Sequence, residues 1–187
     1  MDKEGNYTHV VHVEGDWGGR TNGISGITIG IPRILEVFRA YKIKALFLVS
    51  TELAFENKHY INAIIDRGHE LGSHGHFHIK YKDKWRAQKD KEISDRLLTI
   101  FPGKHPSYCA PWFSYETDSV YSKKVNHVSI LKQTWFGGTL PEDPIFYIHP
   151  FDIVGGDNAP NLFTRILYGR PDAIYNTFTR FARLYNR

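Results

Sequence analysis

Residues 45–49 read Ala-Leu-Phe-Leu-Val, a continuous apolar run that is typical of a strand covered on both faces of a parallel sheet. Shorter segments of the same kind predict further strands at 8–14, 69–73, 107–110, 128–131 and 145–149. Helical spacing of apolar residues predicts helices between them, at 31–38, 59–67 and 84–101, and a last one at 174–185. Strands that alternate with helices predict an α/β fold with a parallel sheet. So few strands predict a small or incompletely closed barrel.

The composition is that of one globular domain. Of 187 residues, 41% are hydrophobic and 24% are charged, which excludes a disordered or collagen-like chain. No run approaches the roughly 18 apolar residues of a membrane-spanning helix, and the polar N-terminus lacks the apolar centre of a secretory signal. No repeat or linker divides the chain. We therefore expect a single domain, 1–187, in a cytoplasmic protein.

The formal net charge of +4 comes from the C-terminal end of the chain. Residues 161–187 contain one acid, Asp172, and five arginines: Arg165, Arg170, Arg180, Arg183 and Arg187. Because the rest of the chain is neutral, we expect no nucleic-acid partner. A helical apolar stripe in the same segment has two interpretations, peripheral contact with an anionic membrane or packing on the core. The stripe consists of Ile174, Phe178, Phe181 and Tyr185.

A histidine cluster is the most specific feature. Residues 68–78 read Gly-His-Glu-Leu-Gly-Ser-His-Gly-His-Phe-His, and the strand predicted at 69–73 leads directly into the last three histidines. His74 and His78 are four residues apart, so one helical turn would place both imidazoles on the same side. Two imidazoles with one carboxylate are a common ligand set for catalytic zinc. A solvated turn is the structural alternative.

Two acids, Glu14 and Asp16, stand at the end of the first predicted strand. An acid that emerges from an apolar strand must be paired, hydrogen-bonded or bound to a cation. The structural alternative is an acid that caps the next helix. Six glycines between 15 and 30 predict a loop that wraps a ligand. Two more strand ends carry Pro111-Trp112-Phe113 and His149-Pro150, so four groups of polar or aromatic residues are expected at one edge of the sheet.

The order of these motifs resembles that of the polysaccharide deacetylases, also called the NodB-homology family, over residues 8–152. The segments 68–78 and 148–152 are especially similar to family signatures, and 14–36 is similar to the branch that deformylates lipid-linked aminoarabinose. The resemblance implies a deformed or incomplete (β/α) barrel of the polysaccharide deacetylase type. It also implies a divalent metal, usually zinc, and removal of an acetyl or formyl group from the nitrogen of an amino sugar.

Carried over by position, Asp16, His74 and His78 match the metal ligands of the family, and Glu14 matches its general base. In the alternative register with adjacent acids, Gly15 occupies the base position and no base remains. His149 matches the histidine that protonates the leaving amine.

Trp112 falls where the family offers a backbone amide to the oxyanion. Trp17, Trp112 and Phe113 are candidates for stacking on the sugar.

Two departures from the family affect the general base, and therefore turnover, but not the metal ligands. The base is Glu14 instead of Asp, and Cys109 replaces the arginine that holds the base. Arg20 and His12 are candidates to orient Glu14 in its place. We find no match to the acid-containing fourth motif, which tunes the acid histidine.

These departures leave two alternatives to a metal-dependent hydrolase. The first is a non-catalytic protein that binds metal or carbohydrate with the same site. The second is a cysteine hydrolase with Cys109 as nucleophile, which needs a depressed thiol pKa and a positioned base.

Overall fold

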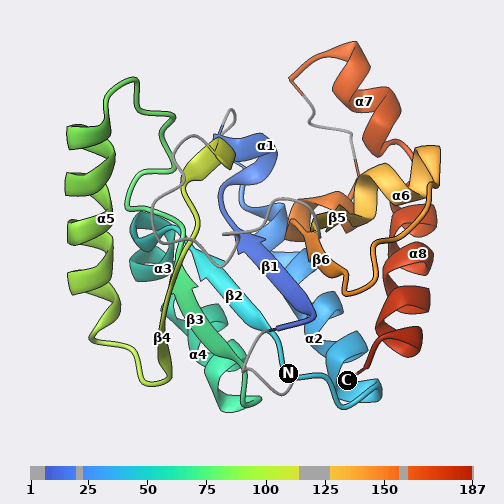
Figure 1. Cartoon of the computed structure of the whole chain (residues 1–187), viewed down its shortest axis with the longest axis horizontal. Helices are drawn as coiled ribbons and strands as arrows, with labels where there is room; N and C mark the ends of the chain where they lie inside the picture. Colours follow the sequence, from blue (N-terminus) through green and yellow to red (C-terminus); the bar gives the residue numbers. More distant parts are fainter. Residues whose placement is uncertain (1–6, 20–22, 114–126, 156–159, 187) are drawn as a thin grey trace.

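The computed structural model describes residues 7–19, 23–113, 127–155 and 160–186, with the backbone alone at 104, 105 and 113. Its centre is a six-stranded parallel sheet with the order β4-β3-β2-β1-β6-β5 (Figure 1). The strands are β1 (His9–Val13), β2 (Leu46–Val49), β3 (Glu70–Ser73), β4 (Lys104–Tyr108), β5 (His127–Ser129) and β6 (Ile145–Ile148). The predicted parallel α/β fold is confirmed. In the described residues β4 and β5 are edge strands, so the barrel is incomplete.

Helices follow the strands along the chain. The α-helices are α1 (Asp16–Gly19), α2 (Ile31–Ala40), α3 (Thr51–Glu56), α4 (Lys58–Asp66), α5 (Lys84–Leu98), α6 (Ile130–Phe136), α7 (Leu162–Tyr168) and α8 (Pro171–Leu184). A π-helix, η1 (Gly26–Gly30), and two 3₁₀ helices, η2 (Pro111–Phe113) and η4 (Pro150–Ile153), complete the described elements. None of the described helices is both long and apolar enough to cross a membrane.

The two faces of the sheet differ in what covers them. Val11 and Val13 of β1 belong to the main core, which α2, α4 and α8 cover. Val10 faces the opposite side, where the hydrophobic cluster is much smaller. Because strand side chains alternate between faces, His12 shares the side of Val10. The thinner cover of this face leaves space beside the carboxyl end of β1.

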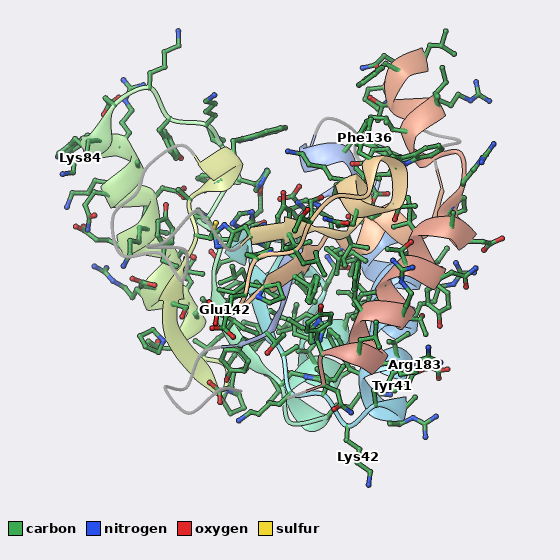
Figure 2. The ribbon with its side chains drawn as sticks, turned by 45° about the vertical axis from the view of Figure 1, so that its right-hand side comes forward. Tyr41, Lys42, Lys84, Phe136, Glu142 and Arg183 are labelled. Carbon is green, nitrogen blue, oxygen red and sulfur yellow. The ribbon has the colours of Figure 1, made fainter. Side chains whose placement is uncertain are left out.

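The apolar stripe near the C-terminus packs on the core. Ile174, Phe178 and Phe181 of α8 are at most 4% exposed. Arg183 of α8 and Tyr41, which follows α2, lie at the same end of the molecule (Figure 2), where Nδ2 of Asn186 donates a hydrogen bond to the carbonyl oxygen of Tyr41 at 3.0 Å. Of the two interpretations of this stripe, packing on the core is confirmed, and peripheral membrane contact through its apolar residues is wrong because these are buried within the fold.

Local structure corrects several predicted elements. The strand predicted at 128–131 ends at Ser129, whose side chain accepts a hydrogen bond from the backbone of Lys132 and caps α6. The short helices α3, α6 and α7 were not predicted. The glycine-rich segment 15–30 is partly helical, because it contains α1 and η1.

Two of these glycines are required by close packing of η1 on η4. A Cβ on Gly30 would lie 2.1 Å from the backbone oxygen of Pro150, and one on Gly26 would lie 2.8 Å from the backbone nitrogen of Phe151. Without side chains at 26 and 30, the backbone of η1 seats directly against the start of η4. This contact fixes the position of His149, which caps η4.

Candidate metal centre and active-site pocket

A pocket of about 420 Å³ lies at the carboxyl ends of the strands. Residues that follow β1, β3 and β6 line it together, because parallel strands bring their carboxyl ends to one edge of the sheet. The lining residues that carry titratable or aromatic groups near the sheet are His12, Glu14, Trp17, His74, His78, Trp112, Tyr147, His149 and Phe151. The predicted gathering of polar and aromatic residues at this edge is thus observed.

Three lining side chains are close enough to share a cation. Oε2 of Glu14 lies 3.1 Å from Nε2 of His74 and 2.5 Å from Nε2 of His78. One ligand atom from each residue lies within 4.8 Å of the other two. All three side chains are at most 7% exposed. This cluster has the composition of a two-histidine, one-carboxylate site.

The hydrogen bonds of Nδ1 in His74 and His78 determine the protonation of the Nε2 atoms that face Glu14. Nδ1 of His74 lies 2.8 Å from the carbonyl oxygen of Cys109, and Nδ1 of His78 lies 3.3 Å from that of Gly18. A carbonyl oxygen only accepts, so each Nδ1 carries a proton. In the neutral rings both Nε2 atoms then present lone pairs to the carboxylate of Glu14. Such lone pairs require a cation between them, either a proton or a metal ion.

The electrostatics of the cluster favour neutral imidazole beside an ionised acid. Burial lowers the pKa of His74 despite the neighbouring carboxylate. Burial raises the pKa of Glu14, but nearby positive charge, that of His149 first, outweighs burial and holds that pKa well below its usual value. An ionised, buried carboxylate beside the neutral ring of His74 fits a divalent cation.

Asp16 does not reach the two histidines, which corrects its predicted place among the ligands. Its Oδ2 accepts the backbone N–H of Ser25 at 2.8 Å and the Ser25 hydroxyl at 2.5 Å, and its Oδ1 accepts the N–H of Gly26 at 2.8 Å. The chain turns at Gly15 after β1, so Asp16 points to the start of η1. The structural alternative, an acid that caps the next helix, describes Asp16.

His74 and His78 come together through a loop, so the prediction that one helical turn aligns them is wrong. Gly75 and His78 have positive φ angles, 80° and 47°. Asp90 of α5, which the sequence analysis missed, holds the loop: its carboxylate accepts the backbone N–H groups of His76 and Phe77 at 2.8 and 3.3 Å. A Cβ on Gly75 would lie 2.5 Å from Asp90 Oδ2, so this approach needs glycine.

His149 extends the pocket beyond the cluster. Its Nε2 lies 3.9 Å from Oε1 of Glu14, and Oδ2 of Asp152 lies 3.4 Å from its Nδ1. Burial lowers the pKa of His149, but the charges of Asp152 and Glu14 outweigh burial and raise it to about 9. His149 is therefore a cation at neutral pH. Asp152 is an acid beside His149 that the sequence analysis did not identify, and its signal in the sequence was the His-Pro-Phe-Asp spacing of a cap.

The predicted sugar-stacking residues differ in exposure and in whether the structure describes their side chains. Trp112 is 43% exposed, lines the pocket and lies 5.7 Å from His78 between ring centres. Trp17 also lines the pocket, but it is 7% exposed and packs against Phe151. The side chain of Phe113 lies outside the described residues.

The two candidates to orient Glu14 have different outcomes. Arg20 lies outside the described residues. His12 lines the pocket, with its ring centre 4.7 Å from that of His74 and 5.3 Å from that of His149. Glu14 itself contacts His74, His78 and His149.

Cys109 acts through its backbone. Its carbonyl accepts from His74, whereas its thiol is 1% exposed and burial raises the thiol pKa. A protonated thiol outside the pocket lining does not fit a cysteine nucleophile. The thiol, His12 and His74 form a second group with metal-ligand spacing, but a neutral thiol is a weak ligand.

The chain belongs to the polysaccharide deacetylase family, whose model matches residues 25–127. Over 99 residues it is 28% identical to the peptidoglycan deacetylase of Helicobacter pylori, which covers 51% of this chain and 33% of that protein. The chain therefore spans about a third of the length of this relative.

Solved structures of this family share the fold. A CE4 family pseudoenzyme from Bacillus anthracis has a TM-score of 0.61 at 15% identity, covering 98% of this chain and 63% of that one. A family 4 carbohydrate esterase from Streptomyces lividans, in complex with acetate, has a TM-score of 0.54 at 14% identity, covering 95% and 90%. The fold is thus an incomplete barrel of the deacetylase type, as expected.

Proposed function

We propose that this protein is a metal-dependent hydrolase that removes an N-acyl group, acetyl or formyl, from an amino sugar. The observation that carries the proposal is the cluster of Glu14, His74 and His78, in which Nε2 of both rings lies beside one carboxylate oxygen while Nδ1 of each ring faces a backbone carbonyl. The family of the chain supports a carbohydrate substrate. The similarity to a peptidoglycan deacetylase supports an acetyl group on the substrate. A formyl group is included because residues 14–36 resemble the aminoarabinose deformylase branch.

Glu14, His74 and His78 would hold a divalent cation, for which zinc is the best candidate because two imidazoles and one carboxylate are its usual donors. When bound, such a cation polarises an amide carbonyl and activates a water molecule. The carbonyl oxygens of Cys109 and Gly18 keep both rings in the tautomer that presents Nε2.

His149 is the proton donor of the proposed reaction. It is charged at neutral pH, it lines the pocket, and its Nε2 lies 3.9 Å from the carboxylate of Glu14. A protonated imidazole in this position donates to the amine nitrogen as the amide bond breaks. Asp152 holds Nδ1 so that Nε2 points into the pocket. Trp112 offers an exposed ring on which the sugar can stack.

A second candidate function is supported by the small number of carboxylates in the pocket. Among the described residues that line the pocket, Glu14 is the one acid, and the carboxylate of Asp16 instead accepts hydrogen bonds from Ser25 and Gly26 at the start of η1. Its Oε2 faces the histidines, which leaves Oε1 alone to accept a proton from water. If Oε1 does not serve as the base, the protein is a carbohydrate-binding protein that keeps the metal site without turnover.

One assay separates the two functions. The purified chain is loaded with Zn²⁺, Co²⁺ or Ni²⁺ and incubated with N-acetylglucosamine oligomers and with N-formyl amino sugars, and free amine is measured. The hydrolase proposal expects amine release that disappears in His74→Ala. Metal binding with no amine release from either class of sugar would support the binding protein.

A further inference from the structure

Helix α7 exposes apolar side chains to solvent. None of its residues, all of which are described, is buried. Leu162, Phe163 and Ile166 are 72%, 71% and 61% exposed. In Figure 1 this helix projects from the body of the molecule on the side of α1. Neighbouring exposed apolar residues of this size usually mark a binding surface.

The same helix forms a wall of the pocket that contains Glu14. Phe163, Leu167 and Tyr168 line this pocket. The carbonyl oxygen of Leu167 accepts a hydrogen bond from Nε1 of Trp135 at 2.8 Å, which fixes the end of α7 to α6. The exposed surface of α7 is therefore continuous with the pocket.

Three aromatic rings join this wall to His149. Tyr168 packs edge-on against Trp17, with ring centres 4.7 Å apart, and Phe151 lies 5.3 Å from Trp17 and 5.9 Å from Tyr168. The ring of His149 stacks on Phe151 at 5.1 Å. The apolar side of the pocket thus begins at His149, and the two ligand histidines lie on the other side of Glu14.

We propose that the pocket-lining residues of α7, namely Phe163, Leu167 and Tyr168, bind together with Trp17 and Phe151 an apolar group carried by the amine-bearing part of the substrate. The substrate is then an amphiphilic N-acyl amino sugar with an alkyl or aryl substituent. This inference rests on the proposed function, because it takes His149 as the residue that faces the leaving amine. A pocket of about 420 Å³ lies in the usual range for ligands larger than one sugar ring.

The apolar surface of α7 is continuous with the pocket, so the group that covers this surface should belong to the substrate. A sugar ring alone presents C–H groups to an aromatic ring but does not require an aliphatic side chain such as Leu167. The aliphatic and aromatic residues extend outward along α7 from Tyr168 to Phe163. An alkyl substituent that leaves the sugar beside His149 would follow this path and remove Phe163 from water.

The test compares methyl and octyl glycosides of N-acetylglucosamine, with the octyl compound below its critical micelle concentration. Affinity for the metal-free full chain is measured by calorimetry. We expect the octyl glycoside to bind at least about tenfold more tightly, which two buried methylene groups would supply. Phe163→Ser should lower this preference at least about threefold. Leu162→Ser is the matched control: Leu162 is equally exposed on α7 but does not line the pocket.

Equal affinities of the two glycosides, or no binding of either, would overturn the inference. So would an equal loss of preference in Leu162→Ser, because it would indicate nonspecific adsorption to an apolar surface. Amine release from the metal-loaded chain is measured in parallel. Hydrolysis without a chain-length preference removes the inference and keeps the hydrolase, whereas a preference in binding without hydrolysis of either compound removes the hydrolase.

Discussion

Asp152 holds His149 at two points: its Oδ2 accepts the backbone N–H of His149 at 2.9 Å and lies 3.4 Å from Nδ1 of the same residue. The hydrogen bond to the backbone fixes the position of the His149 main chain, and the contact with Nδ1 fixes the orientation of its imidazole ring. Because Oδ2 can only accept, the proton on Nδ1 stays there and Nε2 is the nitrogen that exchanges protons in the pocket.

Asp152→Asn should lower kcat/KM for N-acyl sugar hydrolysis about 10- to 100-fold. Loss of the Asp152 charge also removes one of the two charges that raise the pKa of His149. The alkaline limb of the pH–rate profile should therefore lie at lower pH than in the unsubstituted protein. Asp172→Asn, an exposed acid at the start of α8, is the control and should leave the profile unchanged. An unshifted alkaline limb in Asp152→Asn would exclude this role.

Glu14→Gln should lower the metal content of the protein, whereas Asp16→Asn should leave it unchanged. The amide of Gln is a poor ligand, so Glu14→Gln should lower zinc affinity at least about tenfold. Asp16→Asn should keep zinc, because Asp16 contacts Ser25 and Gly26 and does not contact the histidines. Equilibrium dialysis against a zinc chelator followed by elemental analysis measures both. If Asp16→Asn loses zinc and Glu14→Gln retains it, the ligand set inferred from the structure is wrong.

Asp90→Ala should weaken zinc binding without touching a ligand. Two backbone N–H groups between His74 and His78 lose a charged acceptor. Both hydrogen bonds are only partly buried, so each loss should cost about 1 kcal/mol, near the net value of an ordinary hydrogen bond. The loop then holds the two histidines less firmly, and both the midpoint of urea unfolding and zinc affinity should fall. Glu92→Ala, on the same helix but exposed to solvent, should change neither quantity. A normal zinc affinity in Asp90→Ala would show that the loop is held by other contacts.

His69 should make the fold sensitive to acid. Burial lowers its pKa to about 4, from 6.5 in the unfolded chain, and its Nδ1 accepts the N–H of Ala45 at 3.2 Å. Above pH 6.5 both states are neutral. As the pH falls from 6.5 toward 4, the unfolded chain gains a proton that the folded chain excludes, so the free energy of unfolding decreases.

The variant His69→Asn keeps an acceptor but does not titrate. Urea unfolding at pH 7, 6, 5 and 4 should show a smaller loss of stability in this variant than in the unsubstituted protein. The exposed His59→Asn is the control. Identical pH dependence in His69→Asn and the unsubstituted protein would contradict the assignment.

The sequence by itself determined the parallel sheet and the edge at which the site lies. The four central strands occur where short apolar segments predicted them, because a strand buried in a parallel sheet needs side chains that are apolar on both faces. The edge strands only overlap their predictions: β4 begins three residues before the predicted 107–110, and β5 ends two residues before the end of the predicted 128–131. The glycines, acids and histidines after these segments could be placed at one edge because parallel strands end together. His74, His78 and His149 are brought to one pocket as this argument expected.

Only the tertiary structure decided which acid joins the histidines. Glu14 and Asp16 are two residues apart, and the sequence alone favoured Asp16. The turn at Gly15 sends Asp16 to η1, where three hydrogen bonds hold it, and leaves Glu14 beside the imidazoles. Asp90 and Tyr168 reach the site from helices distant in the chain. Their roles depend on contacts between segments, which no local pattern of residues encodes.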